Sequence, residues 1–107
     1  MIEELLRQER ELERAKILCE TARIPWRELQ RFFAAGKVFW VAPELDLVDI
    51  ATALQQDDLQ RVQALTENGQ LAPASDEQAK AWIGDDAVLW AVVIKPWVLV
   101  QDKATDD

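Results

Sequence analysis

The segment from Lys37 to Asp49 constrains the fold most, because a short apolar stretch is followed almost at once by a helix start. Residues Val38–Val41 are β-branched or aromatic, which is typical of a strand, and both alternating faces are apolar. Pro43 cannot donate to a strand ladder, so it ends this stretch. Asp46 carries the short carboxylate that accepts amide N–H groups in the first turn of a helix. The segment therefore predicts a strand covered on both faces, with a helix beginning directly after it.

A second apolar stretch, near the C-terminus, predicts the rest of a small sheet. Val88–Ile94 is apolar on both faces, which favours the middle of the sheet. Lys95-Pro96 interrupts it, and Trp97–Val100 resumes either as a bent continuation or as a strand folded back beside the first. A sheet of two or three strands keeps open edges, so we expect an apolar edge at Trp97–Val100 that invites a second chain.

Helical periodicity accounts for most of the remaining chain. Apolar residues recur at helical spacing over about 3–22, 25–35, 47–56, 58–68 and 75–84. The fold class expected is α+β: two N-terminal helices, a strand, three helices, and a C-terminal strand or strand pair in a two- to three-stranded sheet. At 107 residues the chain is predicted to be one domain, 1–107, with a charged helical extension over 1–11 and a frayed acidic tail over 102–107.

The first helix carries an apolar stripe at steps of seven, three and four residues, formed by Leu5, Leu12, Ala15, Cys19 and Ala22. One interpretation is a solvated helix that docks this stripe on its own core. The alternative is an antiparallel or intersubunit helix pair, because the first ten residues have a helical pattern yet are too polar to be core.

Composition excludes several classes of function. The chain contains no histidine and no tyrosine, so the commonest general base and transition-metal ligand are missing. Three glycines cannot build a phosphate-binding loop, and the single cysteine, Cys19, allows no intramolecular disulfide. We therefore expect no cofactor and no catalytic residue. The chain is expected to be cytoplasmic, because its N-terminus is charged throughout and Ala87–Ile94, its longest apolar run, is too short to cross a bilayer.

The net charge of −8 is unevenly distributed. Residues 1–31 carry equal numbers of acidic and basic side chains, so the excess negative charge lies in residues 32–107. Such a body repels phosphate backbones, and we predict neither a nucleic-acid nor a membrane partner.

Acidic residues gather at the predicted turns and helix starts: Glu44, Asp46, Asp49, Asp57, Asp58, Asp85 and Asp86. Helix capping is the interpretation we prefer, with Asp49 resembling the second half of a capping box that begins at Asp46. The alternative is a small enzyme or a divalent-metal-binding protein that uses the carboxylates around Asp46 and Asp49. That hypothesis requires them to converge with Asp57 or Asp85 in one pocket.

Five tryptophans are the other unusual feature, since aromatic rings at a sheet edge are typical anchors of protein interfaces. Our preferred hypothesis is a non-enzymatic protein–protein interaction module, with self-association as a homodimer. A third hypothesis, an acidic mimic of nucleic acid that binds a basic partner, rests on net charge alone. The candidate interaction surface combines the predicted sheet edge with the acidic helix starts, and comprises Trp40, Glu44, Asp46, Asp49, Trp97 and Leu99.

Several short runs together resemble a family of small prokaryotic proteins known only as a domain of unknown function. These runs include Ile24-Pro25-Trp26, Leu45–Ala51, Asn68–Leu71 and the Pro-x-Val-Leu-Val-Gln ending at Pro96–Gln101. The resemblance covers roughly residues 12–102. It implies no activity, substrate or cofactor, so it assigns no functional residues.

Overall fold

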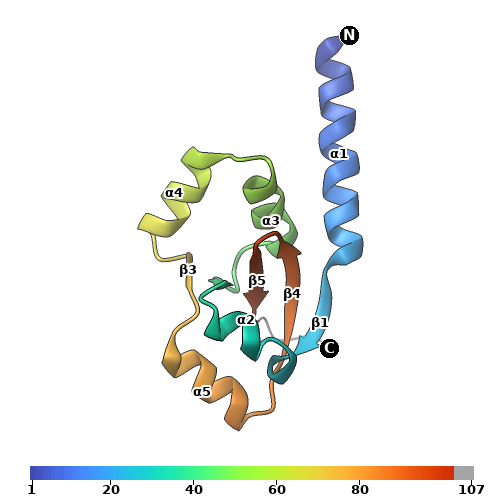
Figure 1. Ribbon diagram of the computed structural model, residues 1–107. Coiled ribbons are helices and arrows are strands. Elements are labelled where there is room, and N and C mark those ends of the chain that lie inside the picture. The colour runs from blue at the N-terminus through green and yellow to red at the C-terminus, as the bar shows by residue number, and fades with distance from the viewer. Residues whose placement is uncertain (103–107) are drawn as a thin grey trace.

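The computed structural model describes residues 1–102, and the predicted tail beyond Asp102 lies outside the described residues. Five strands form one sheet in the order β1-β4-β5-β2-β3 (Figure 1). β2 and β5 run parallel, whereas the other neighbouring pairs are antiparallel. The strands are β1 (Ala22–Pro25), β2 (Val38–Val41), β3 (Leu71–Pro73), β4 (Val88–Ile94) and β5 (Trp97–Gln101).

The α+β class is confirmed, but the predicted sheet of two to three strands is wrong. β1 and β3 are only four and three residues long, and both end in a proline, Pro25 and Pro73. Such short stretches show no strand periodicity, so their sequences predict a helix break and a linker. They are strands because each pairs with an apolar strand of the core, β4 or β2.

The open edge predicted at Trp97–Val100 is also wrong. β4 and β5 form a hairpin through Lys95-Pro96, in the register Ile94↔Trp97, and β5 lies between β4 and β2 in the interior of the sheet. The free edges belong to β1 and β3. Their prolines lack backbone N–H donors, which makes both edges poor templates for another strand.

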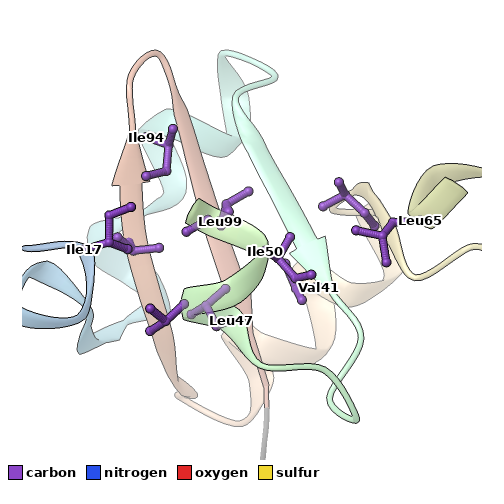
Figure 2. Close-up of a cluster of buried hydrophobic side chains, with 11 residues drawn as sticks. Ile17, Val41, Leu47, Ile50, Leu65, Ile94 and Leu99 are labelled. Atoms are coloured by element: carbon purple, nitrogen blue, oxygen red, sulfur yellow. The ribbon is translucent and has the colours of Figure 1, made fainter. Parts of the chain in front are cut away.

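Helices cover both faces of the sheet. One face packs beneath α1 (Ile2–Glu20), α3 (Leu47–Gln55) and α4 (Leu59–Glu67). Figure 2 shows this core, with Ile17, Val41, Leu47, Ile50, Leu65, Ile94 and Leu99 labelled. The other face packs beneath the 3-10 helix η1 (Trp26–Glu28), α2 (Gln30–Ala34) and α5 (Asp76–Gly84). Because side chains alternate along a strand, two cores form, and burial on both faces explains the near-continuous apolar runs of β4 and β5.

The predicted helix over 25–35 is divided into η1 and α2. Trp26 is buried, with 1% of its surface exposed, and its backbone N–H donates to the carbonyl of Ala87 at 2.9 Å. This hydrogen bond holds the start of η1 against the loop that precedes β4. Trp26 and Leu29 are buried in the second core, and the half-buried Phe32 and Phe33 pack against it.

α1 projects beyond the rest of the molecule (Figure 1). With α1 included, the molecule measures 52 × 30 × 26 Å along its principal axes. Ile17 is its only buried residue. The prediction that Leu5, Leu12, Ala15 and Cys19 dock on the protein's own core is wrong, because all four are exposed. Ala22, the last residue of the predicted stripe, lies in β1.

One buried polar side chain joins the sheet to the loop before α3. The amide nitrogen of Gln101 donates to the carbonyls of Ala42 and Leu45, at 2.9 and 2.8 Å, while only 3% of this residue is exposed. Within residues 1–102, no helix is both long and apolar enough to cross a membrane.

Candidate functional site

The structure separates the six predicted interaction residues into four places. Trp97 and Leu99 line an apolar groove, Asp46 and Asp49 bind a residue of α1, and Trp40 and Glu44 lie elsewhere. β5 is an interior strand, and the structure does not bring the six residues together on one surface.

The groove containing Trp97 opens between α4 and the β3 side of the sheet, and has a volume of about 170 Å³. The residues that line it come from five elements: Phe39, Leu54, Val62, Thr66, Leu71, Pro73, Trp97 and Leu99. Leu71 and Leu99 are buried and form part of its wall, whereas Phe39, Leu54, Val62 and Trp97 are half-buried. The groove is thus a place where the first core reaches the surface.

Aromatic packing shapes one side of the groove. The rings of Phe39 and Trp97 meet edge to face, with centroids 5.2 Å apart and planes at 85°. Such a pair holds both rings in place. Phe39 and Trp97 therefore form an aromatic wall on one side of the groove.

Asp46 and Asp49 form an ion-pair cluster with Arg14 of α1. Two guanidinium nitrogens of Arg14, Nε and Nη2, donate to Oδ1 of Asp49 at 2.9 and 2.7 Å, and Nη2 also contacts Oδ2 of Asp46 at 3.3 Å. The hydrogen bond to Asp49 is the main reason that the pKa of Arg14 is raised above its ordinary value. The cluster ties α1 to the start of α3.

The predicted N-cap at Asp46 is confirmed. Its Oδ1 accepts the N–H groups of Val48 and Asp49, at 2.9 and 3.3 Å. The carboxylate of Asp49 instead binds Arg14 and makes no capping box.

The metal hypothesis requires Asp46 and Asp49 to converge with Asp57 or Asp85. Within residues 1–102, no group of three or more histidine, cysteine, aspartate or glutamate side chains is arranged to hold a metal ion. Asp57 adopts a left-handed turn conformation, with φ of 56°, and Asp86 pairs with Arg27 at 3.1 Å. Among these acidic residues, Asp46 caps α3, Asp49 and Asp86 form ion pairs, and Asp57 lies in a turn.

Trp40 and Glu44 make separate local contacts. Trp40 lies on the second face of the sheet, where its indole N–H donates to the carboxylate of Asp102 at 3.3 Å. Glu44 accepts a hydrogen bond from the side chain of Gln70, also at 3.3 Å. Neither residue reaches the groove.

Sequence reasoning missed the groove residues Phe39, Leu54, Val62 and Thr66. Three of these are apolar residues at strand or helix spacing, which the pattern alone assigns to core. They become a surface feature only through the order of the sheet, which brings β2, β3 and β5 beneath α4.

Comparison with known proteins places the chain in a family. Residues 12–102 match the model of a family described as "Protein of unknown function (DUF2288)". A protein solved by NMR in solution, PA1075 from Pseudomonas aeruginosa, is 46% identical, with a TM-score of 0.77 over 85% of this chain and 84% of that one. None of the curated proteins matches this sequence. The chain is thus a member of the DUF2288 family, whose activity is unknown, and shares its fold with the Pseudomonas protein.

Proposed function

We propose that the protein is a non-enzymatic interaction module whose partner inserts an apolar side chain into the Trp97 groove. The observation that carries this proposal is the groove itself, where an apolar cavity with a half-buried tryptophan opens to solvent. Tryptophans in apolar pockets are the residues that most often dominate the binding energy of protein interfaces.

The size of the groove favours a side chain over a small molecule. Pockets for drug-sized ligands and cofactors have volumes of roughly 300–1,000 Å³, whereas this groove has about 170 Å³. A space of this size suits one or two apolar side chains of a protein segment. Its lining also lacks the charged groups that orient a polar substrate.

The charge of the molecule adds a second property of the partner. The net charge is −8, and residues 1–31 are neutral, so the part of the chain that contains the groove carries the negative excess. A segment with lysine or arginine beside its apolar anchor would be steered towards this surface. The proposed partner is therefore a protein segment with basic and apolar residues, rather than nucleic acid or a membrane.

The proposal places this module in the bacterial cytoplasm. The match to a Pseudomonas protein supports a bacterial setting. A lone, exposed Cys19 is typical of proteins in a reducing compartment.

The test is a titration followed by ¹H–¹⁵N NMR, with acetylated, amidated peptides as probes. One peptide carries a leucine and a tryptophan between lysines, and its control carries serines in their place. We expect the first peptide to shift the amides of Phe39, Val62 and Trp97 with a dissociation constant of roughly 1 mM or below, and the control to leave them unchanged. No shift at these residues at saturating peptide would refute the proposal.

A pair of lysine substitutions on α4 locates the binding. Thr66 is exposed and lines the groove, whereas Gln63 is exposed on the same helix outside it. Thr66→Lys should weaken binding about tenfold or more by placing a charged chain over the cavity, and Gln63→Lys should leave it unchanged. Equal binding by the two variants would show that the peptide sits elsewhere.

A further inference from the structure

The face of α1 that points away from the body carries a heptad-like stripe. Leu5, Gln8, Leu12, Ala15 and Cys19 follow one another at steps of three and four residues, the spacing that forms the seam of a helix pair. The exposed fractions of Leu5 and Leu12 are 60% and 71%, which is unusual for leucines at regular positions of one helix face. We call these five residues the outward stripe of α1.

The opposite face of α1 makes the contacts with the protein's own body. Ile17 is buried in the first core, and Arg14 binds Asp46 and Asp49. Ile17 precedes Cys19 by two residues, so the two side chains are rotated by about 200° around the helix axis. Figure 1 accordingly shows the sheet and α3 on one side of α1 only. The outward stripe therefore has no cover from the described part of its own chain.

The geometry points to a second copy of this protein as the partner of the outward stripe, with the two α1 helices antiparallel. The argument comes from the charges that flank the stripe. Glu9 and Lys16 lie beside it on the same side, and within residues 1–102 neither forms an ion pair. In antiparallel helices, residues at this flanking position face their equivalents on the partner helix, so opposite charges there select the register.

One antiparallel register satisfies both the charges and the volumes. When Leu12 packs against Ala15 of the second copy, Glu9 lies beside Lys16 of that copy, and the two-fold symmetry repeats both contacts. Large side chains then meet small ones along the helical part of the seam, with Leu12 opposite Ala15 and Gln8 opposite Cys19.

The competing arrangements bring like charges together. Sliding the antiparallel pair by one heptad towards the N-termini places Glu9 against Glu9 and Glu11 against Glu11. In a parallel pair, Glu11 lies beside Lys16 of the second copy, which is attractive. For each such contact, however, Glu4 lies beside Glu9 of the second copy, which is repulsive. The favoured register is the only one of the three with attractive pairs alone.

This inference is independent of the groove, because the two surfaces lie near opposite edges of the sheet. α1 contacts β4 at the β1 side of the sheet, whereas the groove lies at the β3 side. A dimer through α1 leaves both grooves open.

The first test is sedimentation equilibrium of the full chain, compared with two aspartate variants. Leu12 and Leu59 have exposed fractions of 71% and 72%, so neither Leu12→Asp nor Leu59→Asp should unfold the protein, which far-UV circular dichroism checks. We expect the wild type and Leu59→Asp to form dimers with equal dissociation constants, and Leu12→Asp to be monomeric at the same concentrations. A monomeric wild type at every concentration, or a Leu12→Asp variant that dimerises like the wild type, would overturn the inference.

A charge exchange and a cysteine variant test the register. Lys16→Glu should raise the dissociation constant about tenfold, and Glu9→Lys combined with Lys16→Glu should restore it. Under mild oxidation, Gln8→Cys should form a disulfide with Cys19 of the second copy. Wild-type dimers should form none, because the two Cys19 residues lie about 16 Å apart along the pair. A Cys19–Cys19 disulfide in the wild-type dimer, or failure of the exchange to restore affinity, would refute the antiparallel register.

Discussion

At the scale of single residues, Gln101 holds two distant segments together. Its buried amide donates to the carbonyls of Ala42 and Leu45, which lie in the loop between β2 and α3. The carbonyl of Ala42 also accepts the backbone N–H of Leu45 at 3.1 Å, so the glutamine adds a second donor there and supplies a donor to the carbonyl of Leu45. The residue thereby fixes the loop from which Asp46 caps α3.

We expect Gln101→Leu to lower the free energy of unfolding by about 1–3 kcal/mol, because the carbonyl of Leu45 loses the donor that Gln101 supplies and the carbonyl of Ala42 keeps only the N–H of Leu45. Gln70→Leu provides the matched control, since Gln70 makes one longer side-chain bond, to Glu44 at 3.3 Å. Its cost should stay below about 1 kcal/mol. Urea unfolding followed by tryptophan fluorescence measures both, and equal losses would show that Gln101 does not hold the loop.

At the scale of elements, periodicity predicted the long pieces well. The strand over Val38–Val41 and the helices α3, α4 and α5 lie where the sequence places them. The predicted cap at Asp46 is present, and Asp58 and Ser75 cap α4 and α5 in the same way. Capping succeeds because it is a local interaction, in which a side chain binds amides two or three residues away.

Periodicity did not predict the short strands β1 and β3 or the orientation of α1. β1 and β3 are too short to show alternation, and their prolines look like breaks. α1 has its regular apolar stripe on the exposed face, whereas a single isoleucine and an ion pair attach the other face to the body. Pattern analysis identifies which residues share a face but not which way the face points.

The attachment of α1 gives a prediction at this scale. Ile17→Ala should lower the free energy of unfolding by about 2–4 kcal/mol, because the side chain is buried to 4% exposure in the first core. Leu18→Ala, at the next position, should cost less than about 1 kcal/mol, since 54% of Leu18 is exposed. Chemical denaturation at low protein concentration makes the comparison, and similar losses would mean that α1 is not anchored through Ile17.

At the scale of the whole molecule, sheet order determines where function can lie. The parallel pairing of β2 with β5 joins segments about 60 residues apart in the chain, and no local pattern indicates it. This pairing removes Trp97 from the expected edge and places it in the groove, beside Phe39. Trp97 and Leu99 of the predicted interaction surface thus line the groove, whereas Asp46 and Asp49 lie at the start of α3, away from it.

The same sheet separates two apolar surfaces, the groove at the β3 side and the outward stripe of α1 at the β1 side. The central claim is that these surfaces have different partners: another protein for the groove and a second copy for the stripe. The sheet edges end in prolines and are poor templates for strand addition. We therefore expect both partners to bind through side-chain contacts rather than through backbone hydrogen bonds.

The most direct measurement is a dilution series of the wild-type protein in ¹H–¹⁵N NMR. The account predicts that the amides of Leu5, Leu12, Ala15 and Cys19 shift with concentration, while those of Phe39, Val62 and Trp97 do not. Spectra that do not change with concentration, or changes confined to the groove, would contradict it.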